Sequence, residues 1–174
     1  MASLRLRYLE RVALGTPYPE VVERVRQVAE TVGRLGRRRL IADATGVGRP
    51  VMDLLRRARL GCIMMPVTIT CGDVETEAGG HYRVPKRDLI VGLQVLLQRG
   101  GLQIAAGLKE CEVLAGELAE MRVKVTQSGN EQYGVWREGQ HDDLVLALVL
   151  ACWGAKKVCP SPLYGEDGYW RGGG

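Results

Sequence analysis

Three acidic residues stand where a metal-dependent hydrolase could use them. Asp43 ends the short apolar run 40–42, while Asp142 and Asp143 directly precede an apolar stretch that begins at Leu144. Hard cations such as Mg²⁺ and Mn²⁺ prefer carboxylate oxygens brought together from separate parts of a chain. Two such ions, about 3.5–4 Å apart, can activate water on one side of a phosphodiester and stabilise the leaving oxygen on the other. The three acids therefore form a candidate hydrolytic metal site.

Each acid also has a structural interpretation. An aspartate at a strand end commonly ties down the following turn, and acids in the first turn of a helix stabilise its macrodipole by about 0.3–1 kcal/mol. For each acid taken alone, these structural roles are the better interpretation. Capping explains the pair Asp142 and Asp143 less well, because like charges buried side by side at the start of an apolar helix are costly without a cation. A metal ion would remove that repulsion.

Basic residues near expected helix starts are candidate phosphate contacts. The stretch 45–49 predicts a tight turn whose backbone amides, together with Arg49, either face a DNA phosphate or serve only the turn. Lys86 and Arg87 open a helix, where positive charge opposes the helix dipole unless it serves an anion, although solvated side chains are the more common outcome. Nucleotide binding at 45–49 is a weaker alternative, since the stretch lacks the third glycine of a dinucleotide loop and the lysine of a P-loop.

The elements that must position these residues alternate between strands and helices. Hydrophobic periodicity predicts strands over residues 4–9, 40–43, 62–69, 82–84 and 102–105. It predicts helices over residues 21–33, 51–55, 85–97, 108–120 and 144–153. Residues 70–80 are expected to form a loop, and 122–125 and 133–136 an antiparallel hairpin. The pattern indicates an α/β fold with parallel strand pairs, in which sites form at the carboxyl ends of strands.

Composition narrows the class of protein. The chain has 174 residues, of which 46% are hydrophobic and 25% charged, as expected for one compact domain. Its net charge of +4 is compatible with a polyanionic partner but does not require one. Five cysteines without a CxxC pair and only two histidines argue against a zinc knuckle or a disulfide framework. No apolar run approaches the roughly 20 residues that span a bilayer, so we expect a soluble, intracellular protein without a membrane partner.

Three stretches, read in order, resemble the nuclease domain of phage terminase large subunits. They are Asp43-Ala-Thr-Gly-Val-Gly-Arg-Pro-Val, Val84-Pro-Lys-Arg-Asp-Leu and Arg137-Glu-Gly-Gln-His-Asp-Asp-Leu-Val-Leu-Ala. The resemblance covers about residues 4–157, and the acid pair opening a buried helix is its most specific part. It implies the RNase H-like fold of retroviral integrases and RuvC-type resolvases, a mixed sheet flanked by helices, over residues 1–157. A flexible tail is expected at 158–174.

The resemblance also assigns roles to individual residues. It matches Asp43 to the second acid of the family's catalytic, metal-binding cluster, and Asp142 and Asp143 to its final pair. The implied cofactor is Mg²⁺ or Mn²⁺, with two ions in an intact site. His141 is expected to support these metal ligands without binding the metal itself. The side chains expected to contact DNA are Arg49, Lys86 and Arg87.

The resemblance implies an endonuclease that cuts concatemeric double-stranded DNA during packaging of a bacteriophage or prophage genome, in the host cytoplasm. Implied partners are the terminase ATPase domain, the small terminase subunit and the portal protein. The family's first catalytic aspartate lies on a strand ahead of residues 4–12, so this acid and two strands are expected to be missing from the chain. The sequence also has no Walker-type lysine motif. The alternative is therefore an inactive remnant that binds DNA or assists assembly of the packaging machinery.

Overall fold

The computed structural model describes residues 3–34, 36–46, 48–105, 107–125, 131–134 and 142–158, with the backbone alone at 48, 49, 122–125 and 131–134. Within these residues the helices are α1 (Tyr18–Gly33), α2 (Gly48–Arg57), α3 (Lys86–Gln98), α4 (Cys111–Glu120) and α5 (Asp143–Val158). The strands are β1 (Leu4–Leu6), β2 (Arg39–Asp43), β3 (Ile63–Thr70), β4 (Thr76–Ala78), β5 (His81–Pro85), β6 (Leu102–Ile104), β7 (Arg122–Val125) and β8 (Glu131–Gly134).

The largest sheet has the order β2-β3-β5-β4. Strands β2, β3 and β5 are parallel, with Asp43 level with Val67 and Val67 level with Tyr82, while β4 runs antiparallel to β5. Strands β1 and β6 form a separate parallel pair, and β7 and β8 form an antiparallel hairpin as the sequence predicts. Its second strand begins at Glu131, two residues before the predicted 133–136, of which 135 and 136 lie outside the described residues. The carboxyl ends of β2, β3 and β5 therefore point to one edge of the mixed sheet, where β3 and β5 continue three residues beyond the level of Asp43, to Thr70 and Pro85.

Two expectations about strands need correction. Part of the predicted loop 70–80 is strand β4, which pairs with β5 across a turn formed by Gly79 and Gly80. Both glycines have positive φ, of 58° and 75°. This conformation suits a two-residue hairpin turn, and residues other than glycine rarely adopt it. The opening strand is shorter than predicted, because β1 ends at Leu6 and its partner β6 is itself three residues long.

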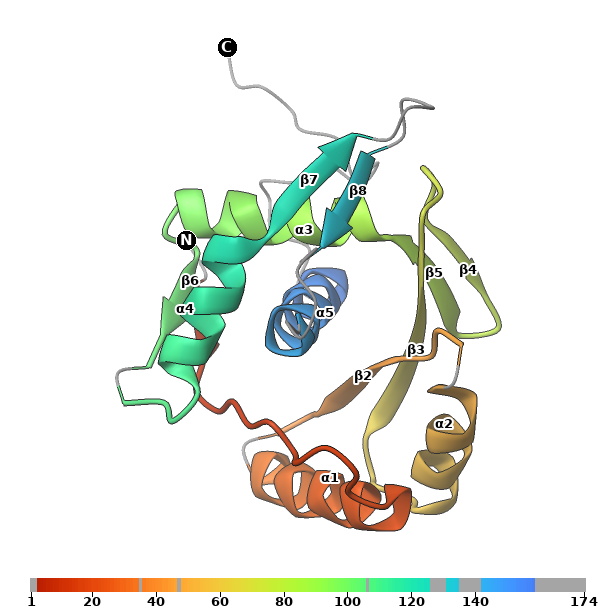
Figure 1. Cartoon of the computed structure of the whole chain (residues 1–174). Coiled ribbons are helices and arrows are strands. Elements are labelled where there is room, and N and C mark those ends of the chain that lie inside the picture. The colour runs from red at the N-terminus through yellow and green to blue at the C-terminus, as the bar shows by residue number, and fades with distance from the viewer. Residues whose placement is uncertain are drawn as a thin grey trace.

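Helix α5 forms the centre of the main core (Figure 1). Its ribbon lies between α3 and α4 on one side and the strands of the largest sheet on the other. Val145 and Val149 on this helix are 0% and 1% exposed, and Val67 on β3 and Val84 on β5 are fully buried in the same cluster. A helix that is apolar all round requires such a position, as the sequence predicts for residues 144–153.

Helices α1 and α2 pack with β2 in a second, smaller cluster around Met52 and Leu55. A stripe of four valines on α1 was predicted to face the core: Val21, Val25, Val28 and Val32. None of them is buried, and the one buried residue of this helix is Val22, which lies outside the stripe. Val32 is 43% exposed. The stripe instead lines a groove of about 340 Å³, which also borders the residues after β1 and the edge strand β2.

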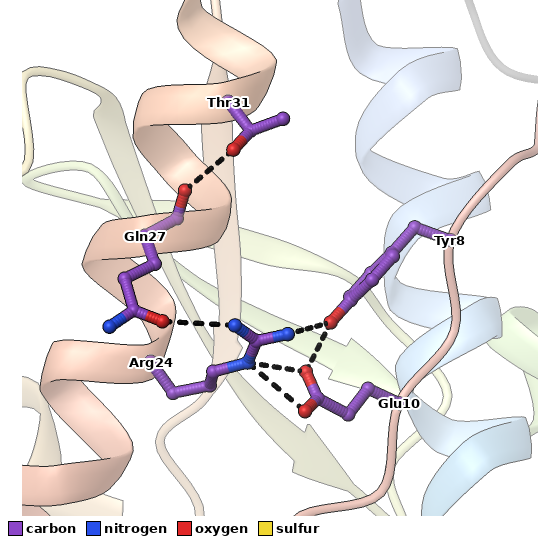
Figure 2. Close-up of polar contacts among 5 residues, drawn as sticks. All are labelled: Tyr8, Glu10, Arg24, Gln27 and Thr31. Atoms are coloured by element: carbon purple, nitrogen blue, oxygen red, sulfur yellow. Dashed lines mark hydrogen bonds and ion pairs between the residues drawn. The ribbon is translucent and has the colours of Figure 1, made fainter.

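Polar contacts fasten α1 to the segment that follows β1 (Figure 2). The Arg24 guanidinium donates through Nε to both carboxylate oxygens of Glu10, at 3.0 and 2.9 Å, and through Nη2 to the Tyr8 hydroxyl at 2.6 Å. The Tyr8 hydroxyl donates to Glu10, and this bond, followed by those from Arg24, lowers the pKa of Glu10. Along α1, Arg24 donates to the side-chain oxygen of Gln27, and the backbone carbonyl of Gln27 accepts from the Thr31 hydroxyl. No helix in the described part of the chain is long and apolar enough to cross a membrane.

Candidate metal site

Asp43 is the last residue of β2, at the carboxyl edge of the parallel strands. Its side chain is exposed, and its Oδ1 accepts a hydrogen bond from the Thr45 backbone N–H at 2.8 Å. The turn that follows is tied to β3, since the Ala44 N–H donates to the Val67 carbonyl at 2.7 Å and the Ile69 N–H donates to Thr45 Oγ1 at 2.9 Å. Asp43 thus has the turn-stabilising role expected of a strand-end aspartate, in a turn that is hydrogen-bonded to β3.

Asp142 lies beside Lys86 at the end of β5, although it comes from a distant part of the sequence. It immediately precedes α5, and its carbonyl accepts the first helical bond, from the Leu146 N–H at 2.8 Å. Its side chain is 22% exposed, and its Oδ2 accepts from Lys86 Nζ at 2.9 Å. Lys86 directly follows β5, so this ion pair brings Asp142 to the end of the parallel strands. Asp143, the first residue of α5, has an exposed side chain.

Lys86 and Arg87, the expected DNA contacts of α3, both face carboxylates in this structure. Lys86, at the start of α3, forms an ion pair with an anionic group, and that group is the Asp142 carboxylate. Arg87 lies 3.3 Å from Asp73 and 3.5 Å from Asp88, with 44% of its side chain exposed. Exposed pairs of this kind hold a side chain weakly, by about 0–1 kcal/mol, so Arg87 remains able to exchange partners.

Two predicted site residues lie wholly or partly outside the described residues. His141 is outside them. Arg49 belongs to the first turn of α2, where the backbone alone is described. Their predicted roles, support of the metal ligands for His141 and a phosphate contact for Arg49, therefore stay predictions.

The donor chemistry of this edge suits a hard cation. Asp43 and Asp142 both supply carboxylate oxygens, and the ammonium group of Lys86 occupies a position where positive charge compensates Asp142. Among the residues that the structure describes, however, no three His, Cys, Asp or Glu side chains come together closely enough to hold a metal ion. The three-carboxylate cluster of Asp43, Asp142 and Asp143 thus stays a prediction.

Sequence reasoning missed one carboxylate next to this site. Glu117 on α4 is 7% exposed and accepts hydrogen bonds from the Leu144 and Val145 N–H groups at the start of α5. It also pairs with Arg11. The sequence did indicate that Glu117 is buried. It lies three residues after Leu114 and next to Leu118, on the face of α4 predicted to point inward. An acid on an apolar helix face indicates a specific buried partner.

Comparison with solved structures identifies the fold. The chain matches the large terminase nuclease from thermophilic phage G20c with bound cobalt at a TM-score of 0.60 and 24% identity, over 81% of this chain and 64% of that one. It matches the same nuclease with bound magnesium at a TM-score of 0.59 and 24% identity, over 80% and 62% of the two chains. This chain has the fold of a phage large terminase nuclease. The α/β, RNase H-like architecture that the sequence predicted is thereby confirmed.

The match to the terminase nuclease fold is partial in length. A third structure, of the G20c large terminase nuclease without a stated metal, matches at a TM-score of 0.56 and 22% identity. The chain spans 62–64% of the length of these terminase nuclease chains. No protein-family model matches the sequence, and a search of curated proteins gives no significant match. At this level of identity the terminase nuclease structures establish the fold, and activity is a separate question.

Proposed function

We propose that this chain is a divalent-metal-dependent nuclease domain of the terminase type, which cuts double-stranded DNA by phosphodiester hydrolysis. The observation that carries the proposal is the fold match to nucleases solved with cobalt and with magnesium. It is supported by Asp43 at the carboxyl end of β2 and by Asp142 beside Lys86, which follows the carboxyl end of β5, although the two acids are about a hundred residues apart in sequence. Parallel α/β sheets place their active sites at this edge.

In this proposal Asp43, Asp142 and Asp143 hold Mg²⁺ or Mn²⁺, with room for two ions in a complete site. The bound cation would supply a Lewis acid that activates water and stabilises the leaving oxygen of the phosphodiester. The turn bonds of Asp43 keep its carboxylate at the strand end. With Asp142 committed to a cation, the Lys86 ammonium would be available to a phosphate oxygen of DNA. Further phosphate contacts are proposed for Arg49 and Arg87, and support of the ligands for His141.

A second candidate is a module that binds DNA or assists packaging without cutting. It is favoured by the lack of a three-ligand group among the described side chains and by the Lys86–Asp142 ion pair, which neutralises one ligand without any metal. Under this candidate, Asp→Asn changes at residues 43, 142 and 143 leave DNA binding nearly intact.

Cleavage of supercoiled plasmid in Mg²⁺ or Mn²⁺ separates the two candidates. The wild-type chain is compared with Asp43→Asn, Asp142→Asn and the control Asp53→Asn, which changes an exposed acid on α2 paired with Arg56. We expect both edge variants to lose at least about a hundredfold in rate, since metal assistance contributes several kcal/mol, and the control to cut normally. Circular dichroism verifies that each variant is folded.

The remaining outcomes are also decisive. Cutting that persists in both edge variants would overturn the assignment of the acids. A folded wild-type chain that shifts DNA in a gel without cutting it, equally before and after the Asp→Asn changes, would favour the second candidate.

The setting of this activity is part of the same proposal. Phage DNA packaging in the host cytoplasm, with a terminase ATPase domain, the small terminase subunit and the portal protein as partners, rests on the sequence resemblance alone. The division into a domain at 1–157 and a tail at 158–174 is likewise proposed, although Val158 is the last residue of α5 and residues 159–174 lie outside the described residues. Limited proteolysis that removes only the last residues would support this boundary.

A further inference from the structure

Glu117 connects α4 to the start of α5. Its Oε2 accepts from the Leu144 N–H at 3.0 Å and from the Val145 N–H at 3.1 Å. Its side chain is 8% exposed, and its other oxygen, Oε1, pairs with the Arg11 guanidinium from the segment after β1. Three segments that are distant in sequence therefore meet at this one carboxylate.

The first N–H groups of a helix have no partner within the helix and are commonly capped by the side chain just before it. In α5 this function is carried out by Glu117 from another helix. The Asp142 side chain, in the position before α5, reaches Lys86 instead. Negative charge at a helix N-terminus is favourable, and Arg11 compensates the burial of the Glu117 carboxylate.

We infer that Glu117 is a positioning residue that caps α5 from α4 and thereby fixes Asp142, so that its carboxylate serves the metal edge rather than its own helix. The inference rests on the function proposed above. Without the Glu117 acceptor, the N–H groups of Leu144 and Val145 would compete for the nearest acid, and Asp142 is adjacent to them. Outer groups that orient metal ligands typically contribute about 10–100-fold to metal affinity.

Mn²⁺ binding, measured by calorimetry well below the unfolding temperature, tests this inference on the full chain. We expect Glu117→Ala to weaken Mn²⁺ binding by about 10–100-fold. Glu117→Gln, which keeps an oxygen acceptor for the two N–H groups, should restore most of the affinity. The control Glu112→Gln changes an exposed acid on the same helix and should bind like wild type.

Amide hydrogen exchange provides a readout that does not depend on metal. In Glu117→Ala the amides of Leu144 and Val145 should exchange at least about tenfold faster, while the buried turns around Val149 stay protected. Unchanged exchange at these two amides would overturn the inference.

The outcomes separate this inference from the proposed function. Mn²⁺ binding that depends on Asp142 but is the same in wild type and Glu117→Ala would overturn the positioning role and leave the nuclease proposal standing. A folded wild-type chain that binds no Mn²⁺ would overturn the proposed function, and the positioning role would fall with it.

Discussion

The two sides of β2 are packed in very different ways. On the side of α5, Val145 and Val149 are buried in one cluster with residues of β3, β5, α3 and α4. On the side of α1, the valine stripe lines a groove, with Val32 43% exposed, and the exposed contacts of Arg24 join the helix to the preceding segment. Asp142 and Asp143 stand at the start of the buried helix α5, although the side chains of Asp43 and Asp143 are themselves exposed. The backbone that carries Asp142 and Asp143 therefore belongs to the closely packed side of the molecule, where close packing opposes small displacements of a ligand.

The largest expected difference in the free energy of unfolding comes from making the same Val→Ala substitution on each of the two sides. Val149→Ala removes two methyl groups from a fully packed position and should lower the free energy of unfolding by about 2–3 kcal/mol, from lost burial and the cavity left behind. Val32→Ala in α1 should change it by no more than about 0.5 kcal/mol, since Val32 is half exposed and alanine favours the helix. Urea unfolding measures both. Equal losses would show that the α1 side is packed as tightly as the α5 side.

Close packing between α5 and β2 predicts a penalty for added volume. A Cβ at Gly154 would lie 2.5 Å from Ile41 Cγ1 and 2.6 Å from Ile41 Cδ1. Gly154→Ala should therefore destabilise the protein by about 1–3 kcal/mol, although alanine is the better helix former. In an Ile41→Ala background, where both atoms are gone, the same change should cost less or become stabilising. Equal costs in the two backgrounds would mean that this contact is not the cause.

Alkaline pH should affect the two sides unequally. Burial raises the pKa of Cys152 on α5 from 9.0 to about 11. The folded-state pKa is above the unfolded one, so the contribution of the protonated thiol to stability is complete below pH 9 and is lost as the pH rises towards 11. By pH 10 the free energy of unfolding should fall by about 1 kcal/mol on this account. Denaturant melts at pH 8 and 10 should show a flatter dependence for Cys152→Ala.

The matched control for that experiment is Cys62, which lines the groove beside α1. Desolvation raises the pKa of this thiol too, with nearby Arg38 opposing the shift. Because Cys62 is only half-buried, Cys62→Ala should keep most of the wild-type slope between pH 8 and 10. A flatter curve for Cys62→Ala than for Cys152→Ala would reverse the comparison.

The smallest effect is expected for the polar contacts of Figure 2. Arg24→Ala removes the bonds to Tyr8 and Glu10, yet it should lower the free energy of unfolding far less than Val149→Ala does, because exposed ion pairs gain little in water. Thermal melts at low and high salt measure this, and the difference from wild type should shrink with salt. A loss as large as that of Val149→Ala would mean that this network, rather than apolar packing, holds α1.

Much of the fold could be predicted because its strongest signals are local. The apolar run from Leu144 predicted a buried helix, and strands ending at Asp43 and near Thr70 were visible from their residue types and turns. The hairpin β4–β5 was missed because Thr76–Ala78 is short and carries an acid, and only its pairing with β5 makes it a strand. The half-exposed valines of α1 were assigned to the core because periodicity reports which residues share a face and not what covers that face.

The site divides in the same way. The sequence by itself determined which acids end a strand or open the apolar helix, since these are properties of neighbouring residues. Only the tertiary structure decided that Asp142 reaches Lys86 across 56 residues and that Glu117 caps α5 from another helix. The physical reason is that a charge takes its partner from whichever group packing brings within a few ångströms, and in a parallel sheet with helical connections that group lies far away along the chain.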